Sequence, residues 1–109
     1  MKKITFLLSV ILVTFLLITG VFAGESKDLK NGEKLFKENC AVCHPDGGNI
    51  INPAKTLHKK DLESNGVKSA GDIVGKMRNP GDGMTTFSKE TIPDKDAKEI
   101  AKYILKTFK

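Results

Sequence analysis

The sequence has few of the residues that usually build or cross-link a small core. Its 109 residues include no tryptophan, one tyrosine and two cysteines. A chain of this length forms one domain, too short for two cores or for the usual nucleotide-binding folds. With so few aromatic side chains, a core made of protein alone would be thin. A covalent staple or a bound cofactor would therefore help the fold considerably.

A strong charge of one sign is also lacking. The chain has 18 Lys and Arg residues against 13 Asp and Glu residues. Without Lys2 and Lys3, the remaining 16 basic and 13 acidic residues leave a net charge of +3. This balance is mildly basic and falls short of the charge density typical of nucleic-acid-binding proteins. We expect no nucleic-acid partner.

The one long hydrophobic run lies at the N-terminus. Two lysines precede an almost unbroken apolar stretch at residues 4–18, and a small-x-small pattern follows at residues 21–23. This order predicts a Sec-type signal peptide, residues 1–23, and a mature domain, residues 24–109. The run is at the lower edge of membrane-spanning length, so an uncleaved anchor is the alternative. Because the first cysteine is Cys40, lipidation is not expected. We predict export to the periplasm, with no stable membrane insertion after cleavage.

The two cysteines belong to one motif. Cys40-Ala41-Val42-Cys43-His44 has the Cys-x-x-Cys-His spacing that attaches c-type haem. One helical turn separates the thiols, so each can add across one of the two haem vinyl groups, and the next residue places its imidazole under the iron. The motif predicts one covalent haem c, with thioether bonds at Cys40 and Cys43 and His44 as an axial iron ligand.

Other chemistries also use closely spaced cysteines. An exported protein with two cysteines is ordinarily expected to form a disulfide, and a redox-active dithiol usually follows a strand in a βαβ pattern, which is absent here. A zinc site needs four ligands, and beyond the motif only His58 is available. Export, spacing and the adjacent histidine together favour haem over both the dithiol and zinc.

The second axial position has three candidates. Met84 lies in the segment 79–87, where one proline and two glycines prevent regular structure and let a long side chain point inward. Met77 falls on an apolar helical stripe that explains it as a core residue. His58 lies among charged residues and is explained by a solvated helix face. We favour Met84 as the second iron ligand, with Met77 and His58 as the alternatives.

Iron held between histidine and methionine has limited chemistry. A methionine ligand favours ferrous iron and raises the reduction potential relative to two histidines. With both axial positions filled, no site remains for oxygen, peroxide or a small-molecule substrate. We therefore expect an electron carrier and not an enzyme.

The periodicity of apolar residues predicts an all-α domain. Helices are expected over residues 28–39, 55–65, 69–78 and 93–108, and no alternating strand pattern of useful length occurs. Gly32 falls inside the first of these helices, where glycine costs about 1 kcal/mol. We expect another helix to approach closely at that point.

The ordered set of motifs resembles a class I c-type cytochrome, and within that group the small carriers of the c-six (c6) type. The resemblance spans about residues 31–108 and includes Gly32-Glu33-Lys34-Leu35-Phe36, Cys40-Ala41-Val42-Cys43-His44, Gly47-Gly48-Asn49, Leu62-Glu63-Ser64-Asn65-Gly66-Val67, Gly83-Met84 and Ala101-Lys102-Tyr103-Ile104-Leu105. It implies a small cytochrome c fold, with about four helices around one haem bound by Cys40 and Cys43, and with His44 and Met84 as axial ligands. It also implies that the first and last helices cross where Gly32 and Phe36 meet Tyr103.

The segment 79–84, Asn-Pro-Gly-Asp-Gly-Met, is similar to the loop of c-six-like cytochromes from anaerobic, metal-respiring bacteria. It implies a soluble periplasmic one-electron carrier in a respiratory chain, with transient redox-protein partners. The second hypothesis is a haem-based sensor or ligand-binding module in which Met84 detaches from the iron. A third, an enzyme such as a peroxidase, requires acid–base groups beside an open iron, and His58 is the only spare histidine.

Overall fold

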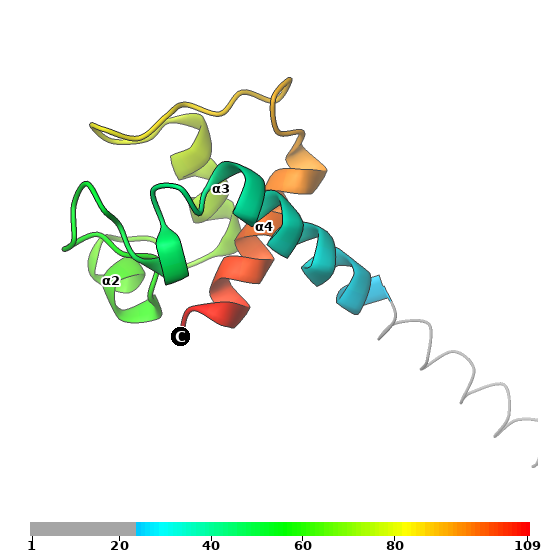
Figure 1. Ribbon diagram of the computed structural model, residues 1–109, viewed down its shortest axis with the longest axis horizontal. Helices are drawn as coiled ribbons and strands as arrows, with labels where there is room; N and C mark the ends of the chain where they lie inside the picture. The colour runs from blue at the N-terminus through cyan, green and yellow to red at the C-terminus, as the bar shows by residue number, and fades with distance from the viewer. Residues whose placement is uncertain (1–23) are drawn as a thin grey trace, which may run out of the picture.

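The computed structural model describes residues 24–109, and the predicted signal peptide lies outside them. Its elements are the N-terminal helix (residues 24–39), the 3-10 helix η1 (Pro45–Gly47), α2 (Lys59–Ser64), α3 (Ala70–Arg78) and α4 (Asp94–Thr107). Within this part of the chain there is no strand, which confirms the all-α prediction (Figure 1). None of its helices is long and apolar enough to cross a membrane.

The N-terminal helix crosses α4 at Gly32 (Figure 1). A Cβ atom at this position would overlap the carbonyl group of Glu99 and lie 3.1 Å from the Cβ atom of Tyr103. One turn further along, the rings of Phe36 and Tyr103 are 5.4 Å apart. The close approach expected at Gly32 is confirmed, and so is the crossing that the family resemblance implies.

A buried carboxylate lies at the same crossing. The side chain of Glu99 is 5 % exposed, and the Asn31 side chain from the N-terminal helix donates a hydrogen bond to it. Because a buried charge is costly without a partner, this hydrogen bond supports the register of the two helices. The ion pairs Lys102–Asp28 (4.0 Å) and Lys106–Glu25 (3.5 Å) connect the same helices at the surface, where such pairs contribute little to stability.

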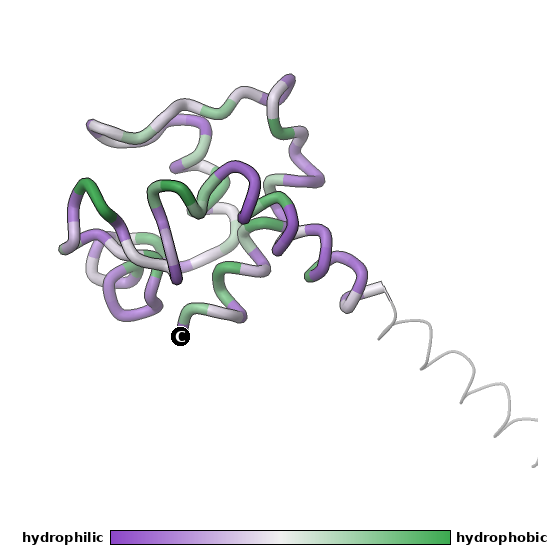
Figure 2. The backbone as a smooth tube through the Cα atoms, viewed as in Figure 1, coloured by the Kyte–Doolittle hydropathy of each residue, from purple (hydrophilic) through white to green (hydrophobic). Residues whose placement is uncertain are grey.

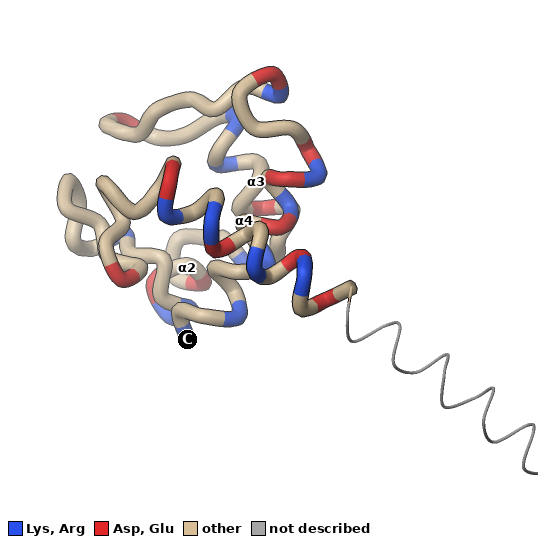
Figure 3. Tube along the Cα trace, turned by 45° about the vertical axis from the view of Figure 1, so that its right-hand side comes forward, with Lys and Arg blue, Asp and Glu red and all other residues tan. Residues whose placement is uncertain are grey.

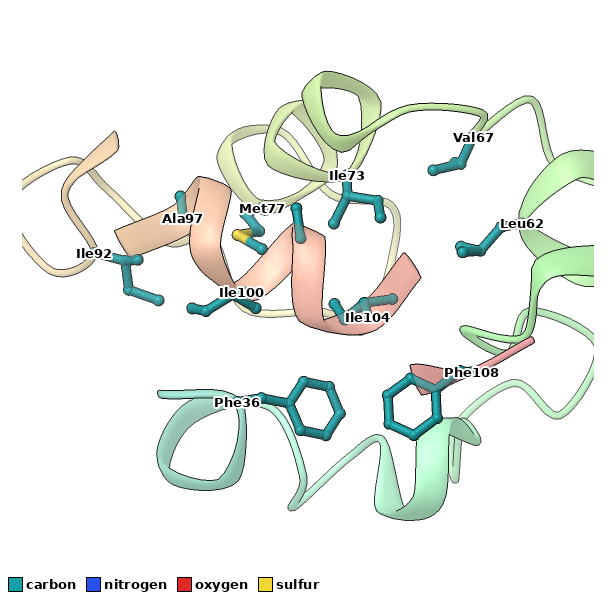
Figure 4. Close-up of a cluster of buried hydrophobic side chains, with 11 residues drawn as sticks. Phe36, Leu62, Val67, Ile73, Met77, Ile92, Ala97, Ile100, Ile104 and Phe108 are labelled. Carbon is teal, nitrogen blue, oxygen red and sulfur yellow. The ribbon is translucent and has the colours of Figure 1, made fainter. Parts of the chain in front are cut away.

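The hydrophobic core gathers around α4. α3 packs against α4, and Figure 4 shows the rings of Phe36 and Phe108 beside the helix, with centroids 5.4 Å apart. Met77 is 3 % exposed, which confirms its assignment to the core. The buried apolar residues are Phe36, Leu62, Val67, Ile73, Met77, Ile92, Ala97, Ile100, Ala101, Ile104 and Phe108.

Local hydrogen bonds set the ends of α3. Ser69 is its N-cap: the Ser69 side chain accepts from the Asp72 N–H (3.1 Å), and the Asp72 carboxylate accepts from the Ser69 N–H (3.1 Å). The Asp72 carboxylate also accepts from the Lys68 N–H (2.9 Å), and these bonds hold the pKa of Asp72 below its usual range. The helix ends at Arg78, before the Asn79-Pro80 pair, in agreement with the prediction.

The prediction for α2 was wrong at its start. We expected this helix from residue 55, but it begins at Lys59. The N-cap residue His58 has an extended backbone (φ −68°, ψ 143°), and the N–H group of Leu57 donates to the carbonyl of Gly47 (2.7 Å), so both residues lie outside the helix. The Thr56 hydroxyl accepts from the N–H of His58 (3.3 Å), which closes a turn in front of Lys59.

Candidate haem site

The Cys-x-x-Cys-His motif forms a single turn at the end of the N-terminal helix. The N–H of Cys40 donates to the carbonyl of Phe36 (2.8 Å), and the carbonyl of Cys40 accepts from the N–H groups of Cys43 (3.1 Å) and His44 (2.8 Å). Both cysteines are half-buried free thiols. The two sulfur-bearing residues and the imidazole are therefore displayed by one short, hydrogen-bonded turn, as attachment at two neighbouring positions requires.

The environment of Cys40 does not suit thiolate chemistry. Burial raises the pKa of the Cys40 thiol to about 11, so this thiol is protonated at neutral pH. Zinc ligation and disulfide exchange both use the thiolate. Within residues 24–109 there is also no group of three or more His, Cys, Asp and Glu residues that could hold a metal ion. The raised pKa argues against the dithiol alternative, whose attacking sulfur needs a lowered pKa.

The imidazole of His44 is held in one tautomer by the main chain. Its Nδ1 atom is 2.7 Å from the carbonyl oxygen of Gly48. A carbonyl can only accept, so Nδ1 carries the proton and Nε2 keeps a free lone pair. Metal-binding histidines commonly use this arrangement, because the second hydrogen bond orients the ring and raises its basicity as a ligand.

A left-handed turn brings the Gly48 carbonyl back to His44. Asp46 (φ 53°) and Gly47 (φ 78°) have consecutive positive φ angles. Asp46 is the one residue other than glycine in the described chain with such an angle. Gly47 also lies against the ring of Phe108, where a Cβ atom would come within 2.6 Å of Cγ. The C-terminal end of the chain thus packs directly on the turn behind His44.

The loop after η1 is braced by the side chain of Asn49. The Asn49 Oδ1 atom accepts from the N–H groups of Ile51 (3.1 Å) and Asn52 (2.9 Å), while Nδ2 donates to the carbonyl of Lys55 (2.9 Å). A single side chain therefore joins both arms of this loop.

Met84 lies in the long segment between α3 and α4. Its neighbour Gly83 has φ 87°, and a Cβ atom there would be 3.2 Å from Cγ2 of Ile51. The Met84 segment therefore touches the loop that follows the haem-attachment motif. Met84 is 37 % exposed, whereas Met77 is buried in the core. His58 is exposed at the N-cap of α2, with its ring 6.0 Å from that of Phe108.

The surface of these segments is apolar and carries few charges. The exposed large hydrophobic residues of the described chain all lie here: Val42 (78 %), Ile50 (63 %), Ile51 (57 %) and Met84 (37 %). Figure 2 shows the hydrophobic stretch in the loop after η1, and Figure 3 shows that Lys, Arg, Asp and Glu concentrate elsewhere, on the helices. An apolar surface beside two thiols and an iron-binding tautomer of histidine fits a covalently attached haem.

Comparisons with known proteins agree with this geometry. The family described as cytochrome c oxidase, cbb3-type, subunit III matches residues 27–104. Cytochrome c6 of Cyanidioschyzon merolae is 41 % identical, over 91 % of this chain and 90 % of its own. Cytochrome c6 of Cyanidium caldarium is 35 % identical, over 89 % and 91 %. The solved structure of OmcF, outer membrane cytochrome F from Geobacter sulfurreducens, is 42 % identical with a TM-score of 0.70, over 72 % of this chain and 99 % of that one.

Fold, site and relatives together define a small c-type cytochrome. Such a protein carries one covalently bound haem c with its iron. Within that class, the chain belongs to the cytochrome c6-like family, whose members are electron carriers rather than enzymes.

Three residues that matter at the site were missed in the sequence. The carbonyl of Gly48 orients His44, the ring of Phe108 packs on Gly47, and the guanidinium of Arg78 binds the segment that follows Met84. The Gly47-Gly48 pair indicated a loop. The sequence did not show that the Gly48 carbonyl accepts from His44, because that contact depends on the left-handed turn at Asp46. Arg78 was indistinguishable from an ordinary basic residue at a helix C-terminus.

Proposed function

We propose that this protein is a periplasmic one-electron carrier of a respiratory chain. Residues 1–23 serve as a cleavable signal peptide, and residues 24–109 form the monohaem domain. Cys40 and Cys43 form the thioether bonds, and His44 and Met84 are the axial ligands. The observation that carries this proposal is the His44–Gly48 hydrogen bond, which in a neutral imidazole places the proton on Nδ1 and leaves Nε2 for the metal, directly after two free thiols.

Each residue of the site has a separate task. The bound haem supplies the one-electron couple between ferric and ferrous iron. The Gly48 carbonyl fixes the ring of His44, and the soft thioether of Met84 favours the ferrous state. With His44 and Met84 as its protein ligands, the iron would leave no position for a substrate, and electron transfer would be the remaining chemistry.

Partner binding is assigned to the apolar residues around the haem motif. Of these residues, Val42 lies between the two cysteines of the motif and is 78 % exposed, and exposed apolar patches commonly mark interaction sites. A small patch of this kind suits the brief encounters of redox proteins, whose interfaces are at the small end of the range. The similarity of the Asn79–Met84 sequence to loops of metal-respiring cytochromes supports a respiratory pathway over a photosynthetic one.

Two methionine variants test the ligand assignment. Ferric wild-type protein should show the weak near-infrared charge-transfer absorption of an iron–sulfur bond. Met84→Ala should abolish this band, while Met77→Ala, which removes the same side chain from the core, should lose about 2–5 kcal/mol of stability and keep it. Loss of the band in Met77→Ala and its retention in Met84→Ala would overturn the assignment.

A redox titration of the same haem-loaded protein tests the pathway. A reduction potential well below that of photosynthetic carriers supports the respiratory role. A potential within the photosynthetic range contradicts it, whatever the ligands prove to be.

A second candidate function is haem-based ligand sensing. It is favoured by the segment that carries Met84, whose residues 81–86 make no hydrogen bond to the rest of the described chain. Rapid binding of carbon monoxide to native ferrous protein would support sensing. Its failure to bind without denaturant would support the carrier.

A further inference from the structure

The segment that carries Met84 is held at its ends and free between them. Residues 81–86 are exposed, and none of them hydrogen-bonds to the rest of the described chain. At the outgoing end, the N–H of Asn79 caps α3. At the returning end, the N–H of Phe87 donates to the carbonyl of Met77 (2.9 Å). The position of Met84 therefore depends on where the chain leaves α3 and where it returns.

One side chain joins these two ends. The Nη1 atom of Arg78 donates to the carbonyls of Phe87 (3.1 Å) and Ser88 (3.1 Å), and its Nη2 atom donates to the Asp94 carboxylate (2.9 Å). The Arg78 side chain is 19 % exposed, and its Nε atom is buried without a partner. Its hydrogen bonds thus connect the end of α3, the returning segment and the start of α4.

We propose that Arg78 is a positioning residue that determines how persistently Met84 occupies the iron. This inference rests on the proposed ligation by Met84. Because residues 81–86 make no hydrogen bond to the rest of the described chain, loss of the Arg78 bonds leaves the returning end held by the bond from the Phe87 N–H to the Met77 carbonyl. The Met84 sulfur then explores a larger volume, and the fraction of molecules with sulfur on the iron falls. Arg78 acts through the main chain and does not touch the metal.

The planar guanidinium is essential to this role. Its separate N–H groups reach two adjacent carbonyls and a carboxylate at once, which the single nitrogen of lysine cannot reproduce. Arg78→Lys should therefore keep the attraction to Asp94 and lose the bridge to the main chain. The charge and the bridge can be tested separately in this way.

The experiment measures imidazole binding to ferric, haem-loaded protein. Imidazole must displace the methionine, so its apparent affinity rises as the methionine-bound fraction falls. Arg78→Gln should bind imidazole about tenfold more tightly than wild type, the factor expected from loss of one charge-assisted hydrogen bond. In Arg78→Gln, the near-infrared iron–sulfur band should also disappear at a lower pH than in wild type.

Lys89→Gln is the matched control. Lys89 is 71 % exposed and lies 3.5 Å from the same Asp94 carboxylate, so its removal takes away an equal charge without touching either carbonyl. Its imidazole affinity and band should match those of wild type. Equal changes in both variants would show a charge effect and overturn the proposal.

The outcomes separate this inference from the proposed function. A wild-type protein without the iron–sulfur band contradicts ligation by Met84 itself. A band that is present in wild type, with unchanged imidazole affinity in Arg78→Gln, contradicts only the role of Arg78. Should Arg78→Gln fail to fold, Arg78→Lys decides: tighter imidazole binding supports the bridge, and wild-type affinity overturns it.

Discussion

The two loops of the haem site are built in opposite ways. On the His44 side, residues 44–57 are crossed by hydrogen bonds, including Nδ1 of His44 to the Gly48 carbonyl (2.7 Å) and the three bonds of Asn49. On the Met84 side, residues 81–86 make none to the rest of the described chain. The loops touch where Gly83 meets Ile51.

The difference means that His44 is preorganised by its own loop, whereas Met84 is only tethered at the two ends of its segment. The chain itself fixes the tautomer and direction of His44, so binding of the metal there costs little reorganisation. Met84 is restrained by the ends of its segment and, in the proposed function, by its bond to the iron. Substitutions in the His44 loop should therefore change the stability of the fold, and substitutions in the Met84 segment should change the state of the iron.

The largest difference is expected between two glycine variants. Gly47→Ala places a Cβ atom at a positive φ angle and against the ring of Phe108, and should lower the free energy of unfolding by about 3 kcal/mol. Gly81→Ala meets no atom within 4 Å, and should leave stability unchanged or raise it by about 0.5 kcal/mol. Denaturant unfolding of both haem-loaded variants measures the difference. Similar losses in the two variants would remove the contrast between the loops.

A smaller effect is expected for two asparagines. Asn49→Ala removes three hydrogen bonds from a largely exposed loop and should cost about 1–2 kcal/mol of unfolding free energy. Asn79→Ala is the control in the other segment, because the Asn79 side chain makes no hydrogen bond in the described structure. Its change should stay within about 0.5 kcal/mol. A loss in Asn79→Ala equal to that in Asn49→Ala would contradict the bracing role of Asn49.

The smallest expected effect depends on pH. The hydrogen bond from Arg78 is the main reason why the pKa of the exposed Asp94 carboxyl lies below its usual range. A lowered pKa in the folded state stabilises the protein above the unfolded value of about 3.9, and this contribution disappears as the pH falls through the folded value. Wild-type protein should therefore melt at a higher temperature than Asp94→Asn at about pH 6, and the gap should narrow at about pH 3.

The double variant identifies the origin of that gap. In an Arg78→Gln background, Asp94→Asn should have less effect on the melting temperature, because the partner of the carboxylate is gone. If Asp94→Asn lowers the melting temperature equally in both backgrounds, the stabilisation by Asp94 comes from its position at the start of α4 and not from its contact with Arg78.

Much of this architecture was predictable because local pattern and tertiary contact agree. The apolar stripe containing Met77 predicted its burial, and the unfavourable Gly32 predicted a close helix contact, which the structure provides at Glu99. The turn of Cys40 to His44 follows from spacing alone. In each of these cases the residue type or the spacing fits one kind of tertiary contact.

The remaining features depend on main-chain groups that residue types do not report. The segment before α2 is extended at His58 and is tied to the loop after His44 by the hydrogen bond from the Leu57 N–H to the Gly47 carbonyl. The acceptor for His44 exists because Asp46, a residue other than glycine, adopts a left-handed conformation. Arg78 donates to the main-chain carbonyls nine and ten residues further along the chain. Every residue has a carbonyl group, so no sequence motif identifies these acceptors.

The crossing at Gly32 has a consequence for how the chain matures. The contact between Asn31 and Glu99 joins positions 68 residues apart, so the helix that leads into the thiols finds its packing partner only when the final helix has been made. A polypeptide that emerges from its N-terminus first must therefore present both thiols before its tertiary structure can close. An enzyme that attaches the haem would therefore act on a chain that has not yet folded. Truncation of the last helix would also remove the packing partner of the N-terminal helix.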